Sequence, residues 1–117
     1  MDREQIKSKI HKLYNHYNIG NYPHVIKESG ILLKKLPNNF FLMNLIGSSF
    51  QRIGQLEKAK KIFEDIISLD HSNTAALSNL GNTYKLLKEY DLAEKNYKQD
   101  LKINPNFSNC LQNYANL

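Results

Sequence analysis

A repeat with a period of 34 residues is the feature that most constrains how this chain can fold, as the spacing of Gly47 and Gly81 shows. A small residue, an aromatic residue, an alanine and a second aromatic residue recur in one order at this spacing: Gly47, Phe50, Ala59 and Phe63, then Gly81, Tyr84, Ala93 and Tyr97. Pro37 and Pro105 lie two periods apart. Such a period indicates stacked copies of one structural unit, each packed mainly on its neighbours.

Each copy is predicted to form two amphipathic helices joined by a short turn. The clearest copy spans residues 77–105, where apolar positions recur every three or four residues in two successive stripes. Gly81 and Ala93 lie within these bulky stripes, which indicates that two helices approach closely there. The first copy is the least faithful, because Leu13 and His16 stand where the period expects a small and an aromatic residue.

A 34-residue unit with this order of residues resembles the tetratricopeptide repeat, which has two antiparallel helices per copy. The resemblance implies an all-α fold, an α-solenoid of about three and a half repeats wound into a right-handed superhelix. It covers nearly the whole chain of 117 residues. We therefore expect one domain over residues 1–117, with repeats at about 6–39, 40–73 and 74–107 and a partial fourth repeat at 108–117.

The amino-acid composition does not identify a class of binding partner. The chain has 16 basic and 11 acidic residues, a formal charge of +5, but its lysines alternate with carboxylates on the second helices and read as a solvated exterior. No basic tract interleaved with aromatic residues is present, so we expect no nucleic-acid partner. The charged N-terminus and the lack of a long apolar stretch predict a cytoplasmic protein without a membrane partner.

The resemblance also implies a binding face, because first helices line a concave groove in this family. Carried onto this sequence, the groove contains ten candidate peptide-binding residues: Tyr14, Tyr17, Phe41, Asn44, Ser48, Arg52, Asn79, Asn82, Asn113 and Asn116. Tyr14, Tyr17 and Phe41 are the expected apolar anchors. The other candidates are polar, and a carboxamide can both donate to and accept from a peptide backbone.

Two pairs of these asparagines, Asn79 with Asn113 and Asn82 with Asn116, are each one period apart. Stacking would repeat them at one level of the groove, which is similar to the asparagine ladder in the repeat region of O-linked N-acetylglucosamine transferases and related bacterial proteins. The alternative is that such segments simply recur in an asparagine-rich repeat.

A second binding mode of the family is not expected. Clamps for the acidic tails of cytosolic chaperones use lysine, arginine and asparagine at five positions, which correspond here to Ile10, Tyr14, Leu45, Ala75 and Asn79. None of the five is a cation, so a dicarboxylate would lack its positive partners.

No pattern in the sequence predicts catalysis, a cofactor or a metal site. The histidines occur without a cysteine or carboxylate pattern, and there is no glycine-rich phosphate loop or nucleophile elbow. The leading hypothesis is a non-enzymatic scaffold that holds an extended peptide or partner helix.

The alternative hypothesis is a substrate-presenting N-terminal arm of a larger enzyme, of glycosyltransferase or sulfotransferase type, that continues beyond Leu117. The unfinished fourth repeat motivates it. A weaker possibility is self-association through the exposed C-terminal helix around Leu111 and Tyr114.

Overall fold

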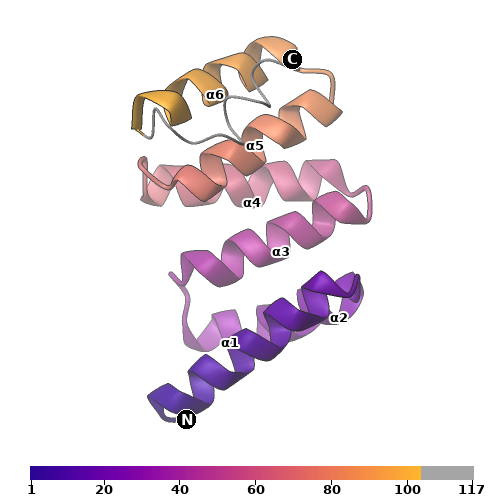
Figure 1. Cartoon of the computed structure of the whole chain (residues 1–117), viewed down its shortest axis with the longest axis vertical. Helices are drawn as coiled ribbons and strands as arrows, with labels where there is room; N and C mark the ends of the chain where they lie inside the picture. Colours follow the sequence, from indigo (N-terminus) through magenta and orange to yellow (C-terminus); the bar gives the residue numbers. More distant parts are fainter. Residues whose placement is uncertain (104–117) are drawn as a thin grey trace.

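The computed structural model describes residues 1–103, and within them the chain forms six α-helices. The helices are α1 (Arg3–Asn18), α2 (Tyr22–Lys35), α3 (Phe40–Arg52), α4 (Leu56–Leu69), α5 (Thr74–Leu86) and α6 (Tyr90–Ile103). They stack as three antiparallel pairs, with α1 and α2 at one end and α5 and α6 at the other (Figure 1). No strand occurs in this range. The predicted all-α helical solenoid is confirmed.

Local sequence signals start and end the helices. The Asn39 carboxamide accepts a hydrogen bond from the Leu42 backbone N–H at 2.9 Å and so caps α3. Each helix pair then turns through a residue with left-handed backbone: Gly20 at φ 86°, Gly54 at φ 84° and Lys88 at φ 63°. The third turn therefore uses a lysine where glycine is the less strained residue.

Close approach of two helices explains the repeated glycine and aromatic residues. A Cβ atom on Gly47 would lie 2.6 Å from Phe63 Cε1, and one on Gly81 would lie 2.5 Å from Tyr97 Cε1. Both rings are fully buried. Each ring therefore packs directly on the backbone of the preceding helix, and only glycine leaves room for it.

In the first helix pair, the large residue is on the first helix and the small residue is on the second, which is the reverse of the later pairs. Leu13 takes the glycine position on α1, and Ser29 takes the aromatic position on α2. Leu13 packs in a cluster with Val25 and Leu32, whereas Ser29 is fully buried and its hydroxyl has no hydrogen-bond partner among the described residues. The pair is thus joined by a different contact from those in the later repeats.

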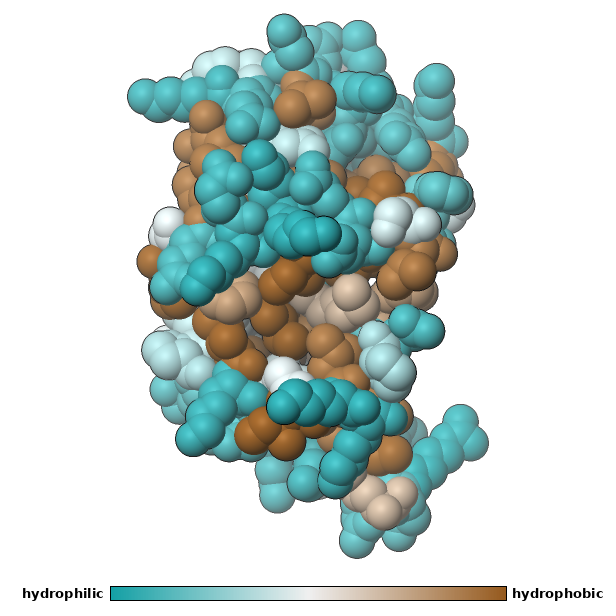
Figure 2. Space-filling view, turned by 180° about the vertical axis from the view of Figure 1, so that it is seen from behind, coloured by the Kyte–Doolittle hydropathy of each residue, from teal (hydrophilic) through white to brown (hydrophobic). Residues whose placement is uncertain are grey.

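Charged side chains on α4 and α6 form pairs within the outer surface. Lys61 Nζ lies 2.8 Å from Asp65 Oδ1, and Lys98 Nζ lies 2.9 Å from Glu94 Oε1. In Figure 2, which shows the side on which α2 and α4 lie, hydrophilic residues form broad areas with apolar residues exposed between them. None of the six described helices is long and apolar enough to cross a bilayer.

Candidate functional site

A polar hollow lies where α1, α3 and α5 meet on the face made by the first helix of each pair. Its volume is about 350 Å³. Seven residues line it: Tyr17, Ser48, Gln51, Arg52, Asn79, Asn82 and Leu86. The fold thus gathers five of the predicted groove residues in one place and adds Gln51 and Leu86, which the sequence reasoning missed.

A hydrogen bond fixes which end of the Asn82 amide faces the hollow. The Tyr97 hydroxyl donates to Asn82 Oδ1 at 2.5 Å, so the Asn82 NH₂ group remains as a donor for a ligand. The Gln51 amide is held by the Thr83 hydroxyl at 2.9 Å, and that hydroxyl also bonds the Asn79 backbone carbonyl at 2.8 Å. Because the hydroxyl has a single proton, these two contacts position the Gln51 amide without assigning its donor and acceptor ends.

In Asn79 the NH₂ group, and not the carbonyl oxygen, is engaged within the protein. Its Nδ2 donates to Asn44 Oδ1 at 3.3 Å, and Asn44 Nδ2 donates in turn to Asn73 Oδ1 at 3.4 Å. Asn73 is itself fixed, because its Oδ1 caps α5 by accepting from the Ala76 N–H at 2.9 Å. This chain of bonds leaves Asn79 Oδ1 as an acceptor. The predicted groove residue Asn44 is placed as a support for Asn79.

Arg52 supplies the positive charge among the residues that line the hollow. It is exposed and lies beside the Tyr17 phenol. Hydrogen bonding and charge attraction to Tyr17 raise the pKa of Arg52 above its ordinary value, so the guanidinium stays charged in any accessible pH range. The Tyr17 ring also packs edge-on against Tyr22, at 5.4 Å between centroids, which holds it in position.

Two predicted aromatic anchors lie on the same face but outside the lining of the hollow. The rings of Tyr14 and Phe41 are 6.0 Å apart at an interplanar angle of 51°, and they remain 44% and 48% exposed. The two rings form an exposed apolar contact between α1 and α3. The predicted partners Asn113 and Asn116 lie outside the described residues, and so does the predicted self-association surface, so the asparagine ladder stays a prediction.

Within residues 1–103 no group of three or more histidine, cysteine, aspartate or glutamate side chains is arranged to hold a metal ion. The polar hollow itself contains no nucleophile paired with a base. Its groups are one cation, an oriented amide donor, an oriented amide acceptor, the Gln51 amide, a serine hydroxyl, the Tyr17 phenol and the apolar side chain of Leu86. Such a set can bind a polypeptide backbone and an anionic group.

The three stacked antiparallel helix pairs define a helical-repeat protein. Models of the tetratricopeptide repeat match residues 42–73 and 74–107, which together make up more than half of the chain. The chain belongs to the tetratricopeptide repeat family.

Among curated proteins, the chain is similar to Hsp70-Hsp90 organizing protein 3 of Arabidopsis thaliana, with 31% identity over 84 residues. The match covers 72% of this chain and 15% of that relative, so the chain spans about a seventh of the relative's length.

Solved structures with low sequence identity share the fold. The first repeat domain of Spaghetti (RPAP3), bound to the HSP90 peptide SRMEEVD, superposes with a TM-score of 0.88 at 21% identity, covering 99% of this chain and 92% of that one. The translocator chaperone SycD of Yersinia enterocolitica gives 0.89 at 14% identity, with coverage of 98% and 92%.

Proposed function

We propose that this chain is a non-enzymatic scaffold that binds an extended peptide of a protein partner along the face made by α1, α3 and α5. The observation that carries this proposal is the fixed orientation of the amides in the polar hollow. Asn82 offers an N–H donor, and Asn79 offers an acceptor. An extended peptide backbone exposes alternating C=O and N–H groups. The amides of the hollow can hydrogen-bond to these groups whatever side chains the peptide carries.

The charge of the hollow determines the class of peptide that we propose. Arg52 and the Asn82 amide donor both line the hollow, so a carboxylate placed between them would gain charge-assisted hydrogen bonds. An acidic side chain or a C-terminal carboxylate meets this requirement. The structural neighbour RPAP3 binds the acidic HSP90 peptide SRMEEVD, which supports an acidic peptide as the first probe.

The proposed binding differs from a dicarboxylate clamp in the position of its cation. The five clamp positions hold no cation here, and Leu45 among them is buried. We propose that the peptide's carboxylate binds at Arg52, roughly one helix turn beyond Ser48, and that Tyr14 and Phe41 receive an apolar side chain of the same peptide.

Selection from a displayed peptide library, followed by affinity measurement of the enriched peptides, tests the proposal. We expect Arg52→Gln and Asn79→Ala each to weaken binding by about five- to tenfold, in line with roughly 1 kcal/mol per polar contact. Lys27→Gln, on an exposed position of α2, is the matched control for the loss of one charge. If Arg52→Gln and Lys27→Gln weaken binding equally, the hollow is not the binding site.

A further inference from the structure

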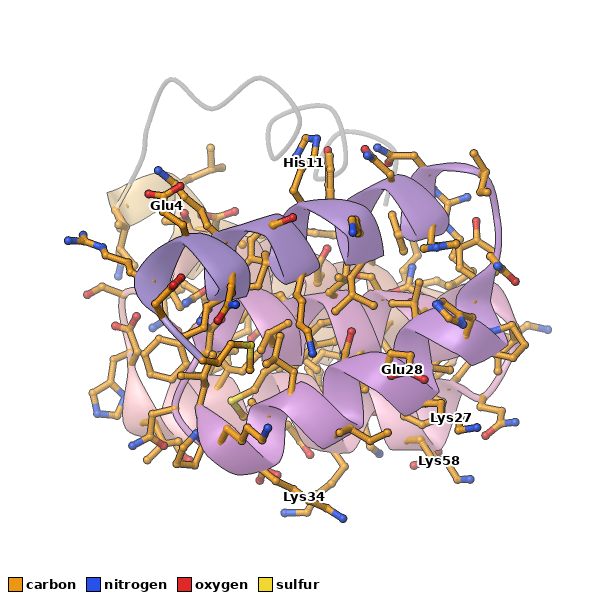
Figure 3. The ribbon with its side chains drawn as sticks, turned by 90° about the horizontal axis from the view of Figure 1, so that it is seen from below. Glu4, His11, Lys27, Glu28, Lys34 and Lys58 are labelled. Carbon is orange, nitrogen blue, oxygen red and sulfur yellow. The ribbon has the colours of Figure 1, made fainter. Side chains whose placement is uncertain are left out.

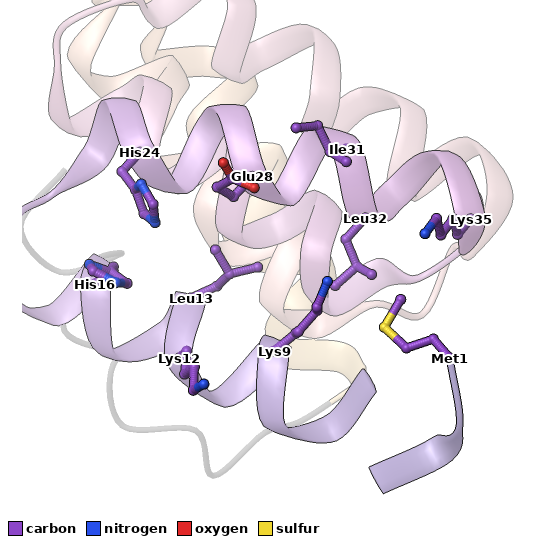
Figure 4. A pocket seen from close by; sticks show the side chains of 10 residues that line it. All are labelled: Met1, Lys9, Lys12, Leu13, His16, His24, Glu28, Ile31, Leu32 and Lys35. Carbon is purple, nitrogen blue, oxygen red and sulfur yellow. The ribbon is translucent and has the colours of Figure 1, made fainter. Parts of the chain in front are cut away.

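A second hollow opens between α1 and α2, away from the polar hollow on the first-helix face. Its volume is about 250 Å³. Figure 4 shows side chains of both helices around it, with Leu13 and Leu32 facing each other across the seam. Ile31, which is 49% exposed, extends this apolar floor. We call this feature the α1–α2 pocket.

The repeat explains why the pocket exists in the first helix pair. Lys9, Lys12 and His16 on α1 occupy the positions that are filled one period later by Met43, Ile46 and Phe50. Met43 and Phe50 pack against the core of the second and third repeats, and Ile46 is buried. Cationic or titratable side chains therefore replace a row of apolar ones, and they leave the seam between the two helices open.

Positive charge surrounds the pocket. Lys9, Lys12 and Lys35 contribute amines to its lining, and none of them has an ion pair within residues 1–103. The imidazoles of His16 and His24 lie together at 4.4 Å between centroids, and Glu28 is the single carboxylate among the lining residues. The rim thus favours a negatively charged ligand.

The size of the pocket restricts what can enter. An apolar cavity of about 150 Å³ holds benzene, so a hollow of about 250 Å³ admits one large aromatic or aliphatic side chain and excludes a whole helix. A second copy of this chain is a poor occupant, because a chain with net charge +5 would bring further positive charge to a cationic rim. The first helix pair could instead serve only to present a polar, solvated end of the helix stack. That role would not require the apolar surface formed by Leu13, Ile31 and Leu32.

We infer that the α1–α2 pocket is a second binding site, which takes a single large apolar side chain from an acidic segment of a partner protein. The apolar side chain lies on Leu13, Ile31 and Leu32. Carboxylates on either side of it pair with the lysine amines of the rim. A partner that engages both this pocket and the polar hollow would be held at two places on one small domain, which raises the overall affinity.

The absence of tryptophan from the chain provides a direct assay. The probe is a blocked peptide with one tryptophan flanked on each side by two glutamates, and its own fluorescence reports binding. The test variant is Lys9→Glu with Lys12→Glu. The control is Lys27→Glu with Lys34→Glu, which changes the net charge equally at exposed positions on the side of α2 that faces away from α1 (Figure 3).

We expect the test variant to bind the probe at least about tenfold more weakly than the wild type, and the control to change affinity less than about twofold. A probe with glutamines in place of glutamates should lose binding to a similar degree. Matching circular dichroism spectra and melting temperatures confirm that both variants fold. Equal losses in the two variants would overturn the inference. So would a loss caused by Arg52→Gln, because the probe would then occupy the polar hollow.

Discussion

Replacing Gly47 by alanine tests the packing that defines this fold. The new Cβ would lie 2.6 Å from Phe63 Cε1, whereas carbon atoms in contact are normally about 3.5–4.0 Å apart. The ring must therefore move by about 1 Å. Phe63 is fully buried, so the movement displaces other core side chains.

Two opposing contributions set the expected size of the effect. Over-packing of a full core costs about 1–3 kcal/mol. Alanine is favoured over glycine inside a helix by about 1 kcal/mol, which offsets part of the cost. We expect Gly47→Ala to lower the free energy of unfolding by up to about 2 kcal/mol and the melting temperature by up to roughly 10 °C. Chemical denaturation and calorimetry measure both quantities.

Gly30 provides the matched control within the same chain. It is also helical, and a Cβ added there would meet no described atom within 4 Å. Gly30→Ala should therefore raise stability by about 0.5–1 kcal/mol through helix propensity alone. The opposite signs of the two effects are the critical result. If Gly47→Ala were as stabilising as Gly30→Ala, Phe63 would not pack on the glycine, and the account of helix-pair closure would be refuted.

Three further predictions concern other parts of the fold. Ser29→Ala should raise stability by about 1 kcal/mol in thermal unfolding, because it removes a buried hydroxyl without a described partner; a loss would show that the hydroxyl is bonded. Lys88→Gly should stabilise by about 0.5–1 kcal/mol, because Lys88 has the left-handed φ that Gly54 adopts one repeat earlier. Burial, and then the 2.9 Å hydrogen bond to Glu64, raise the pKa of Tyr84. The folded state therefore favours the neutral phenol, and its contribution to stability holds below about pH 10 and is lost as the pH rises through the folded pKa. Ultraviolet titrations of the wild type and of Tyr84→Phe should differ by one phenol that ionises above the ordinary tyrosine range, and a difference within that range would contradict the prediction.

The period of the sequence was sufficient to predict the fold. Gly47 and Gly81 predicted close helix approaches, and their distances from Phe63 and Tyr97 show where those approaches occur. The first helix pair was harder to predict. Ser29 lies one period before Phe63, but this exchange of sizes with Leu13 has meaning only once the two positions are known to touch.

The candidate site was predictable as a face but not in its chemical detail. Helical spacing placed Asn79 and Asn82 on the first-helix side of the third pair. Their donor and acceptor ends depend on Asn44 and Tyr97, which are 35 and 15 residues away in the chain. Gln51 was missed for the same reason, because its position depends on a hydrogen bond with Thr83 on a different helix. Periodicity assigns residues to faces and carries no information on such cross-helix bonds.

The central claim is that the polar hollow binds an extended peptide through oriented amides. Its most direct test is a nuclear magnetic resonance titration of the ¹⁵N-labelled chain with the tightest peptide from the library selection. The account predicts that the side-chain NH₂ signals of Gln51 and Asn82 shift on binding, together with the Arg52 guanidinium signal. Shifts confined to α2, α4 and α6, with these three signals unchanged at saturation, would contradict it.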